Sequence, residues 1–216
     1  MFRDRVDAGR RLLAALKGRE YPRGLVLAVP RGGVVVGAEV ARGLGLPLDI
    51  IIPRKIGAPH NPEMAVGAVT QDGTAIYDEH LLVLLGLTPD SLAPKVREQV
   101  REIERRSALY RGGRPPVPWE GRTVILVDDG VATGYTTLAA LRSLRRANPR
   151  RIILAVPVAP PDTVARLRDE VDELVCLLAP EPFYAVGQFY REFDQTDDQT
   201  VIDLMRESVP EVKGEK

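Results

Sequence analysis

The stretch TVILVDDGVATGYTT, residues 123–137, decides the fold. Its four apolar residues, 124–127, form a run typical of a buried strand, and they lead directly into two adjacent acids, Asp128 and Asp129. Glycines and threonine hydroxyls follow before a helical pattern begins near Thr136. We therefore expect a strand, a short loop and a helix, with both carboxylates at the carboxyl end of the strand.

Strand and helix patterns alternate on both sides of this stretch. Apolar runs predict strands at residues 25–30, 49–53, 151–158 and 173–178, and QDG between 65–70 and 74–77 is a hairpin signal. Helical spacing covers residues 34–45, 78–86, 89–110, 136–147, 163–169 and about 200–208. Continuous apolar strands joined by helices are typical of a parallel sheet covered on both faces. The sequence therefore predicts an α/β fold with a mostly parallel central sheet flanked by helices, and with an added β-hairpin.

Length and composition indicate the domain organisation. The 216 residues, 44% of them hydrophobic, favour a single domain, 1–216, with a core at about 20–180. An amphipathic N-terminal helix, 1–18, precedes this core. After Pro180 the sequence becomes aromatic and acidic, which predicts a small hood-like appendage at about 181–210.

Charge, hydropathy and cysteine content argue against a nucleic-acid-binding, a membrane-spanning or a secreted protein. Thirty basic and thirty acidic residues give a net charge of zero, so we expect no nucleic acid among the partners. No apolar run approaches the roughly 20 residues of a membrane span, and the N-terminus lacks an apolar signal core. A single cysteine, Cys176, fits a reducing compartment, so we expect a cytoplasmic protein.

The acids and the loop after them form a candidate ligand site. In an open α/β sheet, ligands bind beyond the carboxyl ends of the strands. The loop 130–135 leads into a helix N-terminus, where free backbone N–H groups favour an anion. Carboxylates repel phosphate. The two acids would therefore bind sugar hydroxyls of the same ligand, or a divalent cation bound to it. The alternative is an ordinary strand-to-helix turn with solvated acids. Neither GK[ST] nor GxGxxG occurs in the chain.

The stretch VILVDDGVATGYTT resembles the phosphoribosyl-pyrophosphate (PRPP) signature of type I phosphoribosyltransferases. Residue type, order and spacing all match. The resemblance implies that Asp128 and Asp129 hold the ribose 2′- and 3′-hydroxyls. It also implies that a run of backbone amides and hydroxyls binds the 5′-phosphate. This run consists of Gly130, Val131, Ala132, Thr133, Gly134, Tyr135, Thr136 and Thr137.

Two further motifs agree with this family. VPRGG, residues 29–33, looks like the family's pyrophosphate-binding loop, in which a cis peptide is common. The residues implied there are Arg31, Gly32 and Gly33. Arg54 and Lys55 in PRKIG follow the second expected strand and resemble basic residues beside the mobile active-site loop. A solvated strand end is the alternative for this pair.

The resemblance implies an enzyme that uses PRPP. A nitrogenous base would replace pyrophosphate at the anomeric carbon, with Arg31, Arg54 and Lys55 stabilising the leaving group. Mg²⁺ would be held mainly by substrate and water, and Asp128 and Asp129 are the candidate direct ligands. A homodimer is expected by analogy. The alternative function is a regulatory protein that binds PRPP without catalysis.

The acceptor base and the mobile loop are less sharply indicated. Ala132 stands where enzymes for 6-oxopurines usually carry an acid, which weakens that substrate class. Aromatic residues of the appendage either stack an acceptor base or form a small core; they are Phe183, Tyr184, Phe189 and Tyr190. Candidates for the mobile loop are 56–68, which has the composition of a loop, and 101–116. For 101–116, a helix with a solvated charged face is the alternative.

Overall fold

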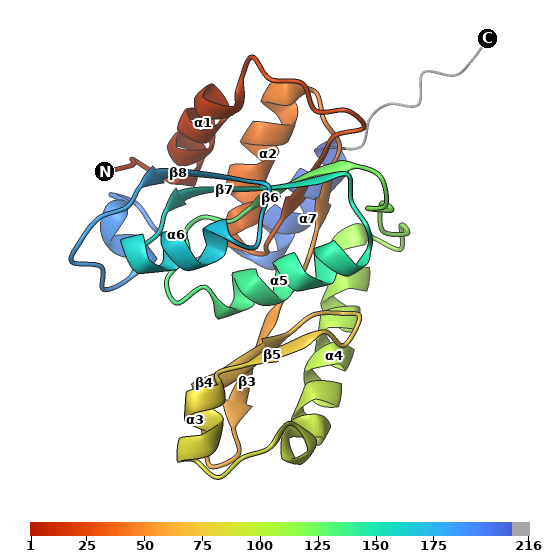
Figure 1. Ribbon diagram of the computed structural model, residues 1–216. Helices are drawn as coiled ribbons and strands as arrows, with labels where there is room; N and C mark the ends of the chain where they lie inside the picture. The colour runs from red at the N-terminus through yellow and green to blue at the C-terminus, as the bar shows by residue number, and fades with distance from the viewer. Residues whose placement is uncertain (209–216) are drawn as a thin grey trace.

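The computed structural model describes residues 1–208 and contains a five-stranded parallel sheet (Figure 1). The strands lie in the order β2-β1-β6-β7-β8, and every neighbouring pair is parallel. Their bounds are β1 Leu25–Ala28, β2 Leu48–Ile50, β6 Thr123–Val127, β7 Arg151–Val158 and β8 Glu173–Leu178. The strand that carries the twin acids, β6, is therefore the central one, and the predicted parallel sheet is confirmed.

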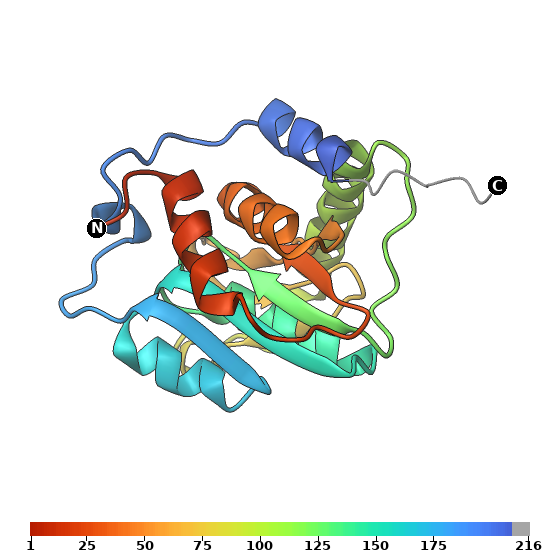
Figure 2. The ribbon, with the colours of Figure 1, turned by 90° about the horizontal axis from the view of Figure 1, so that it is seen from above.

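Helices cover both faces of this sheet (Figure 2). One face carries α1 (Arg5–Leu16), α2 (Gly32–Leu44) and α7 (Asp198–Glu207), and the other carries α5 (Tyr135–Arg146) and α6 (Pro161–Arg168). Successive side chains of a strand point to opposite faces. Accordingly, Ile125 packs in the cluster under α1 and α2, whereas Leu126 packs in the cluster under α5.

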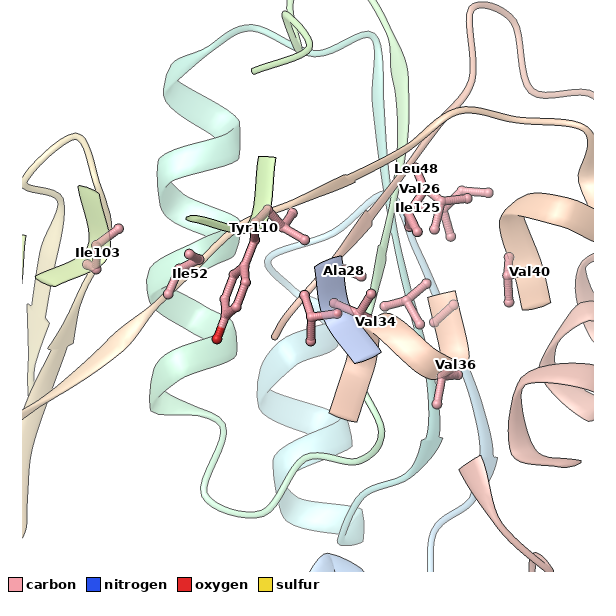
Figure 3. Packing of buried hydrophobic residues seen from close by; sticks show 14 of the residues in the cluster. Val26, Ala28, Val34, Val36, Val40, Leu48, Ile52, Ile103, Tyr110 and Ile125 are labelled. Atoms are coloured by element: carbon pink, nitrogen blue, oxygen red, sulfur yellow. The ribbon is translucent and has the colours of Figure 1, made fainter. Parts of the chain in front are cut away.

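The first of these clusters extends beyond the sheet (Figure 3). Val26 and Ile125 from the strands lie in one cluster with Val34 from α2. The same cluster continues to Ile103 and Tyr110 on α4 (Pro89–Arg111). These side chains are all buried. The continuous core fixes the ends of β1 and β6, which is where the candidate site lies.

A separate three-stranded antiparallel sheet stands below the main sheet (Figure 1). It consists of β3 (Arg54–Ala58), β4 (Asn61–Val69) and β5 (Ala75–Tyr77), in that order. The predicted hairpin around QDG is confirmed. The Asp72 carboxylate accepts hydrogen bonds from the hydroxyls of Thr70 and Thr74, each at 2.6 Å. The helices α3 (Glu79–Leu84) and α4 (Pro89–Arg111) follow this sheet.

Two sequence expectations in this region are wrong. Segment 56–68 has the composition of a loop, but it forms most of β3 and β4. A Cβ at Gly57 would lie 2.4 Å from the Pro62 carbonyl oxygen, so this glycine permits close approach of the paired strands where the register shifts. Arg54 and Lys55 begin β3 and do not end β2.

Segment 101–116 is helical as far as Arg111, which confirms the alternative of a charged helix. Arg105 and Arg106 both pair with Glu102, at 2.8 and 2.7 Å. Arg111 is buried and donates to the Asp49 carboxylate at 2.8 Å. These arginines are therefore engaged in holding α4 together and against β2.

The appendage after β8 is tied to the N-terminus. It contains a short 3₁₀ helix, η1 (Val186–Phe189), and then runs past the start of α1 towards α7 (Figure 2). Backbone N–H groups of Arg191 and Glu192 donate to the carbonyls of Phe2 and Arg3 at 2.9 Å. The last positions of the expected appendage, 209 and 210, lie outside the described residues. Across residues 1–208, no helix combines the length and the apolar character needed to cross a membrane.

Candidate active site

Two loops meet at the carboxyl ends of the neighbouring strands β1 and β6. The N–H of Val29 donates to the carbonyl of Val127 at 2.9 Å, which aligns the loop 30–33 with the acids that follow β6. A Cβ at Gly32 would lie 2.0 Å from Oδ2 of Asp129, and one at Gly33 would lie 2.9 Å from Oδ1 of Asp128. Only glycine permits this approach. The Pro30–Arg31 peptide is cis, as the resemblance of this loop led us to expect.

The two acids have different surroundings. Oδ1 of Asp128 accepts the N–H of Asp129 at 2.8 Å, and burial together with the neighbouring Asp129 carboxylate raises the pKa of Asp128 above its ordinary value. Oδ2 of Asp129 accepts a hydrogen bond from Nε of Arg5 at 2.7 Å. The backbone carbonyl of Asp129 accepts one from the Tyr190 hydroxyl at 2.5 Å. One acid is thus partly buried beside a second carboxylate, whereas the other is paired with a cation from α1.

A cavity of about 320 Å³ opens above these acids. The predicted pyrophosphate loop and the two acids line it, as do residues from the N-terminal helix and the appendage. Its lining is Arg5, Val29, Pro30, Arg31, Gly32, Asp128, Asp129, Phe193, Gln195 and Thr196. The Arg31 guanidinium reaches Oδ1 of Asp198 on α7 at 3.5 Å. The predicted sugar-binding acids and pyrophosphate loop therefore share one cavity.

The loop into α5 presents backbone N–H groups. Gly134 caps this helix with φ of 75°, a left-handed conformation that favours glycine. Within residues 1–208, the N–H groups of residues 132–137 donate to no protein acceptor. The N–H of Val131, by contrast, donates to the Val158 carbonyl at 2.9 Å. Six free amides at a helix N-terminus suit an anion such as phosphate.

Neighbouring elements support this loop. The Thr163 hydroxyl donates to the Ala132 carbonyl at 2.8 Å, and the Arg166 guanidinium donates to the Thr133 carbonyl. Arg166 also lies over the ring of Tyr135, 5.2 Å from its centroid. A Cβ at Gly130 would lie 2.4 Å from Val186, so the start of the loop is packed against η1.

A second cavity, of about 640 Å³, gathers basic side chains between the two sheets. Arg54, Lys55 and Lys95 line it, together with Pro30 from the first loop and Thr136 from the second. Nε of Arg54 donates to Oε1 of Gln99 on α4 at 2.5 Å, and burial followed by the charge of Arg106 lowers the pKa of Arg54. Pro30 lines both this cavity and the acid cavity, so the two adjoin at that residue.

The four aromatic residues proposed for the acceptor pocket are divided between two environments. Tyr190 is only 5% exposed and packs against Phe2, and Phe189 packs against Phe183 with ring centroids 5.0 Å apart. Phe183 and Tyr184 line a third cavity, of about 890 Å³. This cavity also includes Ala132, Thr133, Tyr135 and Arg166.

Three cationic side chains reach the site from elements that the motifs did not include. They are Arg5 on α1, Lys95 on α4 and Arg166 on α6. Each lies in a helix with many other charges, where a cation is usually a solvated surface residue. The sequence carries no local signal that sets these three apart.

Comparison with known proteins identifies the family. A family model described as "Phosphoribosyl transferase domain" matches residues 3–194, which include both loops of the site and the residues of the basic cavity. The chain belongs to the phosphoribosyl transferase domain family. Two Mycobacterium tuberculosis proteins, from strains CDC 1551 and H37Rv, are each 43% identical over 205 residues and are named "Putative phosphoribosyl transferase". The match covers 94% of this chain and 46% of theirs, so the chain spans about half their length.

Solved structures place this phosphoribosyl transferase domain among related folds. TT1426 from Thermus thermophilus is 43% identical, with a TM-score of 0.80, and the match covers 97% of this chain and 99% of that one. A purine phosphoribosyltransferase from Pyrococcus horikoshii is 16% identical with a TM-score of 0.50, covering 89% and 93% of the two chains. This second likeness concerns the fold alone.

Proposed function

We propose that this phosphoribosyl transferase domain transfers the 5-phosphoribosyl group of PRPP to a nitrogenous base and releases pyrophosphate. The observation that carries the proposal is the meeting of three features around the ends of β1 and β6. Two acids face a cavity, six free amides begin α5, and three cations line the adjoining cavity. They match the hydroxyls, the 5′-phosphate and the diphosphate of PRPP.

The chemistry follows from the way in which these three features hold the hydroxyls, the 5′-phosphate and the diphosphate of PRPP. The base nitrogen forms a bond to the anomeric carbon and gives up any proton that it carries to water. The bond from that carbon to the diphosphate oxygen breaks, with its electron pair going to pyrophosphate. Positive charge grows on the sugar beside Asp128 and Asp129. Negative charge grows on the leaving group, where Arg54, Lys55 and Lys95 stabilise it. The protein thus acts mainly by positioning and electrostatics.

Mg²⁺ fits this scheme as a partner of the diphosphate. Within residues 1–208, no group of three or more His, Cys, Asp or Glu side chains could hold a metal ion. Asp128 and Asp129 would supply at most two ligands, and one oxygen of Asp129 is paired with Arg5. A hydrated Mg²⁺ held chiefly by substrate oxygens is consistent with such a donor set. When bound, the ion neutralises the charge that develops on pyrophosphate.

The acceptor base is proposed to enter beside Ala132, where Phe183 and Tyr184 line the larger cavity. Their rings offer an apolar face on which a planar base can stack. Ala132 has no carboxylate to meet a 6-oxopurine, so we propose that the acceptor is another base. Phe189 and Tyr190 belong to the small core under the appendage, and Phe183 packs against that core while it also lines the cavity.

The test is a screen of purine, pyrimidine and related bases with PRPP and Mg²⁺, in which released pyrophosphate is measured. We expect release with at least one base and none from Asp128→Asn/Asp129→Asn. Circular dichroism of the double variant controls for folding. PRPP binding without pyrophosphate release from any base would instead favour the non-catalytic regulator, and a fully active double variant would contradict the assignment of the acids.

A further inference from the structure

The side chain of Arg5 lines the acid cavity and is held by three contacts. Its Nε donates to Oδ2 of Asp129 at 2.7 Å, and its Nη1 donates to the carbonyl of Asp194 at 2.7 Å. The guanidinium lies 3.8 Å from the centroid of the Phe193 ring. Only 13% of the Arg5 side chain is exposed. A charged hydrogen bond, a second hydrogen bond to a different acceptor and stacking on an aromatic ring together fix a guanidinium in one orientation.

The contacts of Arg5 leave part of Asp129 available. Among the described residues, Oδ2 of Asp129 accepts Arg5, whereas Oδ1 accepts no hydrogen bond. The carbonyl of the same residue accepts the Tyr190 hydroxyl. The carboxylate is therefore held at one oxygen and at its backbone carbonyl, and no N–H or O–H group among the described residues donates to its other oxygen. Gly32 packs against the pair, since a Cβ there would lie 2.6 Å from Nε of Arg5.

Charge gives a second reason for a cation at this position. Asp128 and Asp129 are adjacent and both face the cavity, yet the proposed ligand is a polyanion. Two uncompensated carboxylates would repel it, and the repulsion would be strong where water is scarce. Arg5 neutralises one of them without covering both of its oxygens.

We infer that Arg5 is a positioning residue for the sugar: it orients Asp129 so that Oδ1 accepts a ribose hydroxyl, and it joins α1 and the appendage to the ribose site. This inference rests on the proposed binding of PRPP. It assigns a function to the N-terminal helix, which none of the sequence motifs includes. It also gives a role to two residues of the appendage that contact Arg5: Phe193 through its ring and Asp194 through its backbone carbonyl.

Isothermal titration calorimetry with three probes tests the inference. PRPP, ribose 5-phosphate and inorganic pyrophosphate, each with Mg²⁺, are titrated into the wild type, Arg5→Gln, Arg5→Lys and the control Arg10→Gln. Arg10 lies on the same helix, pairs with Glu39 at the surface and does not line the cavity. We expect Arg5→Gln to weaken both sugar ligands by about tenfold, as loss of a charged hydrogen bond does. The affinity of Arg5→Gln for pyrophosphate should stay within about twofold of wild type. All three affinities of Arg10→Gln should stay within the same range.

Arg5→Lys separates positioning from a merely structural role. Lysine keeps the charge beside Asp129 but cannot also bridge to Asp194, so its sugar affinity should fall between those of wild type and Arg5→Gln. If wild type and Arg5→Gln bind the sugar ligands equally well, the inference about Arg5 is wrong and the proposed function still stands. The same holds if Arg5→Gln weakens binding of all three probes equally. Tighter binding by Arg5→Gln also overturns the inference about Arg5, because Arg5 would then compete with the sugar. Failure of the wild type to bind either sugar overturns the proposed function as well.

Discussion

At the scale of single residues, the site depends on glycines that leave room for carboxylates. Gly32→Ala places a Cβ 2.0 Å from the Asp129 carboxylate, so the acid has to move away from the sugar. We expect PRPP affinity to fall at least tenfold, since a charged hydrogen bond is lost. The measurement is calorimetric titration of PRPP.

The matched control for this change is Gly113→Ala, in the turn after α4. Gly113 has φ of 81° with no heavy atom within 4 Å of the added Cβ. Its substitution should cost about 1 kcal/mol of unfolding free energy from backbone strain and leave PRPP affinity unchanged. If the two variants bound PRPP equally well, close packing of the two loops would not matter for binding.

At the scale of elements, α4 contacts α7 through a buried hydroxyl. The Tyr110 hydroxyl donates to Oδ1 of Asp198 at 2.6 Å, and its ring is 1% exposed. Burial, followed by this hydrogen bond to a carboxylate, raises the pKa of Tyr110 to about 12. Because the folded pKa is above the unfolded value of about 10, this contribution to stability is complete below pH 10 and is lost between about pH 10 and 12.

The resulting prediction concerns alkaline pH. Between pH 9 and pH 12, the wild type should lose about 2 kcal/mol more unfolding free energy than Tyr110→Phe, since each pKa unit corresponds to about 1.4 kcal/mol. Urea unfolding at the two pH values measures the difference, and other tyrosines cancel because both proteins contain them. Equal losses in the two proteins would show that Tyr110 titrates normally.

The helix α4 also supplies a cation to the basic cavity. Lys95 lines that cavity beside Arg54 and Lys55, whereas Arg97, on the same helix, does not. Lys95→Ala should weaken pyrophosphate binding by about five- to tenfold, and Arg97→Ala should have no effect. Titration of inorganic pyrophosphate with Mg²⁺ measures both. A similar loss in the two variants would indicate a general charge effect and not a site.

Local patterns in the sequence explain how far the elements could be predicted. The bounds of β6, β7 and β8 agree with the apolar runs, because consecutive apolar residues mark a strand without any information about its partners. The sequence does not predict β3, because Gly57, Pro59 and Pro62 indicate a loop. Gly57 and Pro62 nevertheless lie in a strand pair with register shifts, and Pro59 lies in the turn between the strands. Site residues that follow a strand could be predicted in the same way. Arg5, Lys95 and Arg166 could not, because tertiary packing alone brings their helices to the site.

At the scale of the whole molecule, ligand binding should stabilise the fold. PRPP would bridge β1, β6 and α5, so it binds the folded state and not the unfolded chain. At a free concentration of 100 times its dissociation constant, PRPP should add about 2.7 kcal/mol to the free energy of unfolding. For a domain of this size this corresponds to a rise in Tm of about 5–10 °C. Differential scanning calorimetry with Mg²⁺ present should show this rise for the wild type and not for Asp128→Asn/Asp129→Asn. A similar rise in both proteins would place the ligand elsewhere.

The central claim is that the acids after β6 and the amides before α5 hold the two ends of one phosphorylated pentose. A crystal structure of the protein with PRPP and Mg²⁺ tests this most directly. We predict ribose hydroxyls within hydrogen-bond distance of Asp128 and of Oδ1 of Asp129, with the 5′-phosphate on the N–H groups of residues 132–137. A bound PRPP whose pentose touches neither acid, or whose 5′-phosphate lies outside this loop, would contradict the account.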